Sequence, residues 1–500
     1  MAETTATRQV RYGEAAGRWV LLATVLGSGL AFVDSTVVNI ALPSIGRDLH
    51  ADAAGLQWTV NGYTLSLASL ILLGGSLGDR FGRRRVFVTG VAWFAAASLL
   101  CGLAPNVYLL IAARVLQGIG GALLTPGSLA ILEASFEPAD RSKAIGAWSG
   151  LGGIAGALGP FLGGFLIEVA NWRTVFLINL PLSAIVVAVA WRHVPESRDP
   201  DAADRLDVTG AVLGAIGLGG LTYGFTAWPA MGPTSPVVLG TLAAGVAGLV
   251  GFVLAERRSH HPMLPLAIFR SRAFTGANLV TLAVYAALGG VFFLLVLNLQ
   301  VVAGFAPLPA GLSLLPATLL MLVLSARAGA LSERIGPRIP MTAGPLVAAA
   351  ALLLLSRIGP HASYVRDVLP GVVLLGLGLS LTVAPLTATA LGSVEDRYAG
   401  VASGVNNAVA RAAGLLAVAV LPLAAGLGSG SLTDPVALAH TYRIAMLICV
   451  GLLVAGALVA VALVPGRKTG RESGRESGRE APSPVRVHCS VAAPPLHPRS

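Results

Sequence analysis

Two ionisable residues, Asp34 and Arg114, lie deep inside long apolar stretches of this 500-residue chain. A charged side chain in a membrane is costly, so such an acid or base is usually paired and usually belongs to an ion pathway. Pairing with a cation lowers the pKa of a buried carboxyl group, and separation from the cation raises it. The chemistry that these two residue types could perform together is the uptake and release of one proton. For Asp34, a purely structural acid neutralised by a neighbour is the alternative.

The positions of these two residues within their stretches predict that they meet. Asp34 precedes Pro43, at the end of its stretch, by about 13 Å along a helix, and Arg114 follows Val107, at the start of its stretch, by about 10 Å. The first stretch should run outward and the second inward, so both side chains should lie at a similar depth below one surface. We predict a direct pair in which Asp34 carries the proton and Arg114 modulates it.

A short and very basic loop follows the second apolar stretch, with the sequence GSLGDRFGRRR over residues 75–85. Its acid, Asp79, should lie at the carboxyl end of a helix, where the helix dipole disfavours a negative charge. Such an acid needs a cation, for which Arg83 is available, or the amino terminus of another helix, such as the one expected near Gly400. This need for a partner indicates a functional loop, and a loop that only orients its helices is the alternative. The candidate residues of the loop, to which the resemblance named below assigns a gating role, are Gly75, Asp79, Arg80, Gly82, Arg83 and Arg84.

A glycine-rich segment with one proline, GGIAGALGPFLGG, covers residues 152–164. Small residues at helical spacing on one face, among them Gly152 and Gly156, allow another helix to approach closely. Pro160 removes one backbone hydrogen bond and bends the helix. We interpret the bend as serving an interface between moving parts, with ordinary small-residue packing as the alternative. The residues assigned to this motif are Gly156, Gly159, Pro160, Gly163 and Gly164.

Fourteen apolar stretches carry these side chains, and each is long enough to cross a bilayer as a helix of roughly 20 residues. With 55% hydrophobic and 12% charged residues, the chain is far too apolar for a soluble globular protein. The expected fold class is an all-α membrane protein with 14 transmembrane helices. The predicted spans are 19–42, 56–77, 86–104, 108–130, 144–167, 174–191, 208–228, 236–255, 274–303, 308–331, 340–356, 368–391, 400–425 and 443–464.

An internal repeat divides the chain. The loop at residues 75–84 is echoed in degraded form at residues 329–338, which indicates two parallel halves of six helices each. Basic residues concentrate in the loops of one side, so both termini should be cytoplasmic, and the net charge of +10 reflects topology rather than nucleic-acid binding. The expected divisions are a cytoplasmic N-terminus at 1–18, an N-terminal half at 19–191, two inserted helices (208–228 and 236–255) with polar linkers at 192–272, a C-terminal half at 273–464 and a disordered cytoplasmic tail at 465–500.

The loop at residues 75–85 resembles the signature of the major facilitator superfamily, whose members are secondary transporters. Residues 32–43 around Asp34, residues 110–121 around Arg114 and the segment 152–164 narrow the resemblance to the fourteen-helix drug:proton antiporter branch. Ala155 stands where that branch usually has glycine. The resemblance implies the major facilitator fold with two inserted helices, and proton coupling at Asp34 and Arg114. It also implies that the basic loop latches the two halves on the cytoplasmic side, and that the glycine-rich segment marks the protein as an antiporter.

The function implied by the resemblance is proton-coupled export of drug-like or natural-product amphiphiles across the cytoplasmic membrane. The sequence holds no phosphate-binding loop for ATP and no metal-ligand spacing among its histidines. We therefore expect no enzyme activity, no cofactor and no metal, and an ion gradient as the energy source. The expected partners are a small amphiphilic substrate, protons and the bilayer. The protein is expected to be a monomer. Residues assigned to a substrate pocket are Phe32, Asn39, Trp58, Tyr63, Gln117 and Arg411.

Two other functions stay open at this point. A dedicated exporter of a single endogenous metabolite would share every motif above. A receptor or scaffold without transport is disfavoured, because it needs neither a buried Asp34 nor a basic gating loop nor a bent helix. Asp34 is the acid deep in a span, whereas Arg114, Arg327 and Arg411 are bases there, so neutral, monocationic or anionic substrates fit better than multivalent cations.

Overall fold

The structure is a computed structural model that describes residues 10–199, 207–259, 264–395, 399–426, 432 and 434–466. The predicted tail at 465–500 therefore lies outside the described residues, apart from its first two positions. The described part is helical apart from loops and one isolated β-bridge. Thirteen of its helices are long and apolar enough to cross a membrane, and the remaining predicted span, 144–167, falls on a helix of 32 residues. The predicted all-α membrane fold is confirmed.

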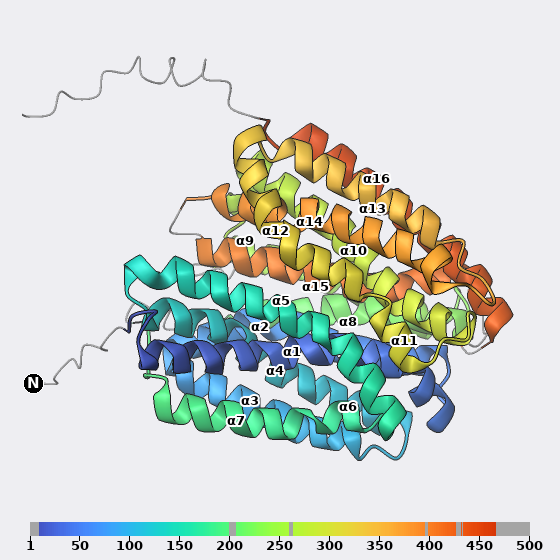
Figure 1. Ribbon diagram of the computed structural model, residues 1–500, viewed down its shortest axis with the longest axis horizontal. Coiled ribbons are helices and arrows are strands. Elements are labelled where there is room, and N and C mark those ends of the chain that lie inside the picture. The colour runs from blue at the N-terminus through green and yellow to red at the C-terminus, as the bar shows by residue number, and fades with distance from the viewer. Residues whose placement is uncertain are drawn as a thin grey trace, which may run out of the picture.

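The first helices, α1 to α7, pack into one bundle, the lower one in Figure 1. Within it, α1 packs against α5 and α7, and α4 lies between α2 and α3. The bounds are Ala15–Asp48 for α1, Ala53–Phe81 for α2, Arg83–Gly102 for α3, Val107–Ser135 for α4, Pro138–Val169 for α5, Thr174–Leu177 for α6 and Asn179–His193 for α7.

The last helices, α10 to α16, form the upper bundle of Figure 1. The two helices between the bundles, α8 (Val208–Met231) and α9 (Pro236–Arg258), pack on each other, and α8 contacts α2 and α15, one helix from each bundle. The remaining bounds are Leu266–Arg270 for the 3₁₀ turn η1, Arg272–Val301 for α10, Pro307–Leu312 for α11, Leu315–Ile335 for α12, Arg338–Leu355 for α13, Tyr364–Val368 for the π turn η2, Leu369–Gly392 for α14, Ala399–Ala424 for α15 and Pro435–Leu463 for α16.

Each predicted span falls on helix. The spans predicted at 174–191 and 308–331 match the candidate membrane spans Thr174–His193 and Pro307–Ile335, although a short break divides the first into α6 and α7 and the second into α11 and α12. The last helix begins at Pro435 rather than at residue 443. Its start is fixed by local chemistry, because Asp434 accepts a hydrogen bond from the Val436 amide and proline suits the first turn of a helix. The prediction missed this start because the polar residues 440–443 interrupt the apolar run that follows Pro435.

The segment before α1 is held against the start of α5. Val10 bridges to Phe136, and the Tyr12 amide donates to Asp140 at 3.0 Å. The hydrogen bond from Tyr12, together with Lys143, holds the pKa of Asp140 below its usual range. The N-terminal bundle is thereby closed at the side where α1 begins and α16 ends, which we call the terminus side. The other end of the helices is the opposite side.

The two bundles touch through specific hydrogen bonds on the opposite side. The side chain of Gln57 on α2 donates to the carbonyl of Val418 on α15 at 3.2 Å. The side chain of Gln300 on α10 donates to the carbonyl of Ile40 on α1 at 3.0 Å. Each bond joins one bundle to the other, so together they hold this side closed.

Candidate functional site

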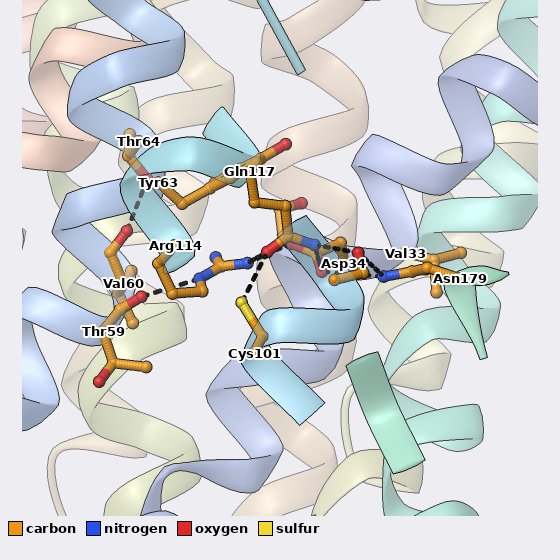
Figure 2. Close-up of polar contacts among 12 residues, drawn as sticks. Val33, Asp34, Thr59, Val60, Tyr63, Thr64, Cys101, Arg114, Gln117 and Asn179 are labelled. Carbon is orange, nitrogen blue, oxygen red and sulfur yellow. Dashed lines mark hydrogen bonds and ion pairs between the residues drawn. The ribbon is translucent and has the colours of Figure 1, made fainter. Parts of the chain in front are cut away.

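An ion pair between Asp34 and Arg114 lies at the centre of the N-terminal bundle (Figure 2). The Arg114 Nη1 atom lies 2.6 Å from Oδ2 of Asp34. The other carboxylate oxygen, Oδ1, accepts hydrogen bonds from Gln117 Nε2 at 2.8 Å and from Asn179 Nδ2 at 3.2 Å. Three donors therefore converge on one carboxylate, an arrangement that suits its ionised form.

The guanidinium of Arg114 is held from several sides. Its Nε atom donates to the carbonyl of Thr59 at 3.0 Å, and Nη1 also donates to Gln117 Oε1 at 2.6 Å. The guanidinium lies over the ring of Tyr63, 4.4 Å from its centre, and 5.7 Å from that of Phe176. Arg114 is 1% exposed and Asp34 is not exposed at all. Buried charges of this kind require a partner, and each provides one for the other.

Side-chain caps at the starts of α2 and α4 bring these groups to the same depth. Asp52 accepts from the Gly55 amide at 2.7 Å, which begins α2, and Asn106 accepts from the Leu109 amide at 2.9 Å, which begins α4. Both helices begin on the opposite side, so Thr59 and Arg114 lie about two turns below it. The predicted contact between Asp34 and Arg114 is what the structure shows, whereas their role in proton coupling stays a prediction.

The same cluster contains polar residues that sequence analysis did not single out. Ser98 on α3 accepts from Gln117 Nε2 at 2.8 Å and from Asn179 Nδ2 at 3.2 Å, and the thiol of Cys101 lies 3.6 Å from Gln117 Oε1. Each of these residues sits alone in an apolar span, without a spacing that links it to Asp34. The signal available was polarity inside a span, which by itself names no partner.

A cavity of about 890 Å³ lies between the two bundles. It extends from Leu314 near the opposite side to Gly146 and Leu391 nearer the terminus side. No charged side chain is among the described residues that line it, and its polar groups are hydroxyls and one amide. The residues that line it include Phe32, Thr36 and Asn39 on α1, Gly156 and Pro160 on α5, and Phe292 and Val296 on α10.

Helix α1 connects the cavity to the ion pair. Phe32, Thr36 and Asn39 line the cavity, whereas Asp34 lies on another face of the same helix and points at α4. The carbonyl oxygen of the Asn39 side chain is buried and has no hydrogen-bond partner among the described residues. The cavity is therefore bordered by the helix that carries the buried carboxylate, although the carboxylate itself is not among the lining residues.

The basic loop at residues 75–85 is bound within the N-terminal bundle. Asp79 Oδ1 pairs with Arg83 at 2.8 Å, as its position at a helix end required. Gly82 has a φ of +115°, and a side chain there would run into the carboxylate of Glu196. Glu196, which follows α7, accepts from the Arg84 amide at 3.1 Å. Sequence analysis missed Glu196, because its partners are more than a hundred residues away in the chain.

The expected contact of Asp79 with the start of the helix near Gly400 is specific to an outward-facing state, and the side chains of residues 396–400 lie outside the described part. On the terminus side, α2 approaches α15 instead at Gly404, where an added Cβ would lie 2.9 Å from Leu72. The other candidate gating residues, Gly75 and Arg80, are on the last turns of α2. The latch role of the loop remains a prediction.

The glycines of α5 meet two different helices rather than one. Gly159 and Gly163 lie against α1, at Thr36 and Val37. Gly164 lies against α11, where an added Cβ would come within 2.5 Å of Leu308 Cα. Pro160 is also next to α11, since a side chain at Gly311 would strike its carbonyl oxygen, and Gly156 borders the cavity. The segment therefore joins the two bundles as well as packing inside one.

The remaining pocket residues of the sequence prediction are dispersed. Gln117 and Tyr63 contact Arg114 rather than bordering the cavity. Trp58 lies against Tyr223 of α8, with ring centres 6.1 Å apart. Arg411 lies on α15, half-buried. Whether any of them contacts a substrate remains a prediction.

Residues 24–418 match the family model described as Major Facilitator Superfamily. The chain is 38% identical over 402 residues to the tetracenomycin C resistance and export protein of Streptomyces glaucescens, covering 80% of this chain and 74% of that protein. It is 37% identical over 464 residues to the puromycin resistance protein pur8 of Streptomyces alboniger, covering 90% and 92%. The multidrug resistance protein Stp of Mycobacterium tuberculosis is 37% identical, with 80% and 74% covered.

Solved structures of transporters share the fold. The POT family transporter PepTSo superposes with a TM-score of 0.66 at 17% identity, covering 89% of this chain and 97% of that one. A bacterial homolog of the human lysosomal transporter Spinster, in its inward-facing and unoccupied conformation, superposes with a TM-score of 0.65 at 18% identity, covering 90% and 97%. At these identities the likeness concerns the fold alone.

Proposed function

The chain belongs to the major facilitator superfamily, and we propose that it is a proton-coupled antiporter that exports drug-like or natural-product amphiphiles across the cytoplasmic membrane, with both termini in the cytoplasm. The relatives named for tetracenomycin C export, puromycin resistance and multidrug resistance support this substrate class. The protein works as a monomer in this proposal, since each step below uses one chain. Its energy comes from protons rather than from a bound cofactor.

The observation that carries the proposal is the buried Asp34–Arg114 pair on the helix that also forms a wall of the uncharged cavity. An acid in a membrane interior is a proton or cation site by default. A cavity with apolar and hydroxyl-bearing walls suits amphiphiles of drug size. Because α1 carries both, a displacement of α1 by a bound molecule changes the separation of the carboxylate from Arg114 on α4.

The exchange follows from that separation. While paired, the carboxylate is bound by three hydrogen-bond donors. When a bound substrate or the rocking of the halves shifts α1 against α4 within the N-terminal bundle, the carboxylate loses its cation and binds a proton more readily. The structure is closed on the opposite side by Gln57 and Gln300, which is the cytoplasm-facing state of this proposal. Return to the paired state releases the proton to the cytoplasm after the substrate has left outside.

Drug-dependent proton movement tests the proposal. Inside-out vesicles that contain the protein are acidified, and a panel of candidate amphiphiles is added while the internal pH is followed with a dye. We expect substrates to release protons from vesicles with the wild-type protein and not from vesicles with Asp34→Asn. The control variant is Asp48→Asn, which removes an acid from the same helix at its exposed end, where it pairs with Arg173. Equal proton release from Asp34→Asn vesicles rejects the coupling role.

The panel also separates a broad exporter from a dedicated one. Relatives named for single compounds, such as puromycin, and a relative named for multidrug resistance are similarly close to this chain. The cavity is roomy and holds few polar groups, which favours several related substrates over one tightly matched metabolite. Proton release by one compound alone identifies the dedicated exporter.

A further inference from the structure

Arg411 lies in the interior of α15 and takes no part in the Asp34–Arg114 pair. It lies about halfway along the helix Ala399–Ala424 and is half-buried. Within the described ranges, no acid forms an ion pair with it. The carboxylate of Asp34 is not available, because it is bound to Arg114, Gln117 and Asn179. A cation held in a membrane protein without an anion is costly and marks a functional site by default.

Contacts between α2 and α15 fix where Arg411 lies. Gln57 on α2 touches Val418 on α15, and Leu72 on α2 lies against Gly404 on α15. The helices are therefore antiparallel, and on α15 Arg411 lies seven residues from each of these contact points, on the same helical face. Arg411 accordingly faces α2, at the boundary between the two bundles.

Asn61 of α2 lies next to this position. It falls between Gln57 and Leu72 on the face of α2 that meets α15, about one turn from the level of Arg411. Asn61 is not exposed, and neither its amide nitrogen nor its amide oxygen has a hydrogen-bond partner in the described part of the chain. A buried amide without partners costs free energy and is rare in native structures. It offers a second donor beside the guanidinium.

Helix α10 links this position to the cavity. Arg411 lies near α10, because one turn further along α15 a Cβ added at Gly414 would lie 4.0 Å from the carbonyl oxygen of Tyr285. Tyr285 precedes Phe292, a cavity-lining residue, by two turns on the same face of α10. The cavity itself has no charged residue among those that line it. A charged group on a bound molecule would therefore have to meet its counter-charge beyond the residues that line the cavity.

We propose that Arg411 and Asn61 form an anion subsite that binds the carboxylate or ionised phenol of an acidic amphiphile whose apolar body occupies the cavity. This inference rests on the proposed export function and narrows its substrate class from amphiphiles in general to neutral and monoanionic ones. A guanidinium binds a carboxylate through charge-assisted hydrogen bonds, and the Asn61 amide donates a further one. The bound anion supplies the partners that both side chains lack.

The test compares two probes that differ in one charged group, naphthalene-2-acetic acid and naphthalene-2-acetamide. Each is titrated calorimetrically into the purified full-length protein in detergent at pH 7.5, without a proton gradient. We expect the wild-type protein to bind the acid at least ten-fold more tightly than the amide. Arg411→Gln should remove this preference and leave amide binding within about two-fold, and Arg411→Lys should keep part of it. Arg327→Gln, at an exposed arginine of α12, is the matched control.

The variant Asn61→Leu distinguishes a role of Asn61 in anion binding from a role in stabilising the fold. If Asn61 serves an anion, the substitution weakens acid binding several-fold, yet raises the unfolding temperature because an unpartnered buried amide is removed. Absence of an acid preference in the wild type, or equal loss of acid and amide binding in Arg411→Gln, overturns the inference. The titration does not depend on Asp34. An intact acid preference combined with failed drug-dependent proton release would therefore reject the export function and not the subsite.

Discussion

At the scale of single residues, Asp34 and Arg114 act as one unit, because neither charge has another partner of opposite sign among the described residues. Removing one partner of a buried pair leaves the other charge uncompensated and costs about 3–5 kcal/mol, whereas removing both costs much less. We expect Arg114→Gln to lower the free energy of unfolding by about 3–5 kcal/mol. The double variant Asp34→Asn with Arg114→Gln should recover most of that loss. Denaturant titration in detergent, followed by tryptophan fluorescence, measures both, and additive losses would contradict the pairing.

The extent to which this cluster could be foreseen also depends on single residues. Asp34 and Arg114 were predicted to meet because each is a charge at a countable depth in a span. Ser98 and Asn179 share no such spacing with Asp34. They join the hydrogen-bonded cluster around Asp34 only because α3 and α7 pack against α1 and α4. Tyr63 was assigned to a pocket by its aromatic type, yet its ring faces Arg114. Chemical type predicted the charged partners and not the direction of neutral side chains.

At the scale of elements, α5 and α11 are in backbone contact between the two bundles. The hydropathy pattern predicted the helices, but not the division of one span into α11 and α12, because the short turn between them is as apolar as its neighbours. An added methyl group at Gly164 would meet the backbone of Leu308, which cannot move away as a flexible side chain can. The glycine is therefore required for the closed opposite side.

We expect Gly164→Ala to destabilise the closed state by about 1–3 kcal/mol through overpacking and to slow export several-fold. The matched control is Gly451→Ala in α16, where an added Cβ meets nothing within 4 Å. Export of a fluorescent substrate from cells measures the rate, and the thermal unfolding temperature checks that both variants are folded. Pro160→Ala, one turn earlier on α5, should also slow export. Normal export by both α5 variants would contradict a role of this segment at the interface between the bundles.

At the scale of the whole molecule, alternating access requires that the contacts closing one side be weak enough to break in each cycle. On the opposite side these contacts include side-chain-to-backbone hydrogen bonds from Gln57 to Val418 and from Gln300 to Ile40. A third hydrogen bond joins the Leu308 amide of α11 to the Glu168 carboxylate of α5 at 2.9 Å. Each of the two glutamine bonds is worth about 0.5–1.5 kcal/mol net. Their sum can shift a two-state equilibrium roughly ten-fold without unfolding either bundle.

Replacing both glutamines by leucine should therefore open the opposite side more often. A cysteine at Asn39, which borders the cavity below this side, reports the opening through its reaction with a membrane-impermeant thiol reagent added outside cells. Of the three native cysteines, Cys101 and Cys449 are buried, and Cys489 belongs to the tail, which is cytoplasmic in this proposal and out of reach of the reagent. We expect labelling about ten-fold faster in the double leucine variant than in the parent Asn39→Cys protein. The control Thr241→Val, which loses only two hydrogen bonds within α9, should not change the rate. An unchanged labelling rate in the double variant would show that the two glutamine bonds do not control opening. It would point instead to the α5–α11 contact, where Gly164 lies against Leu308 and the Leu308 amide donates to Glu168.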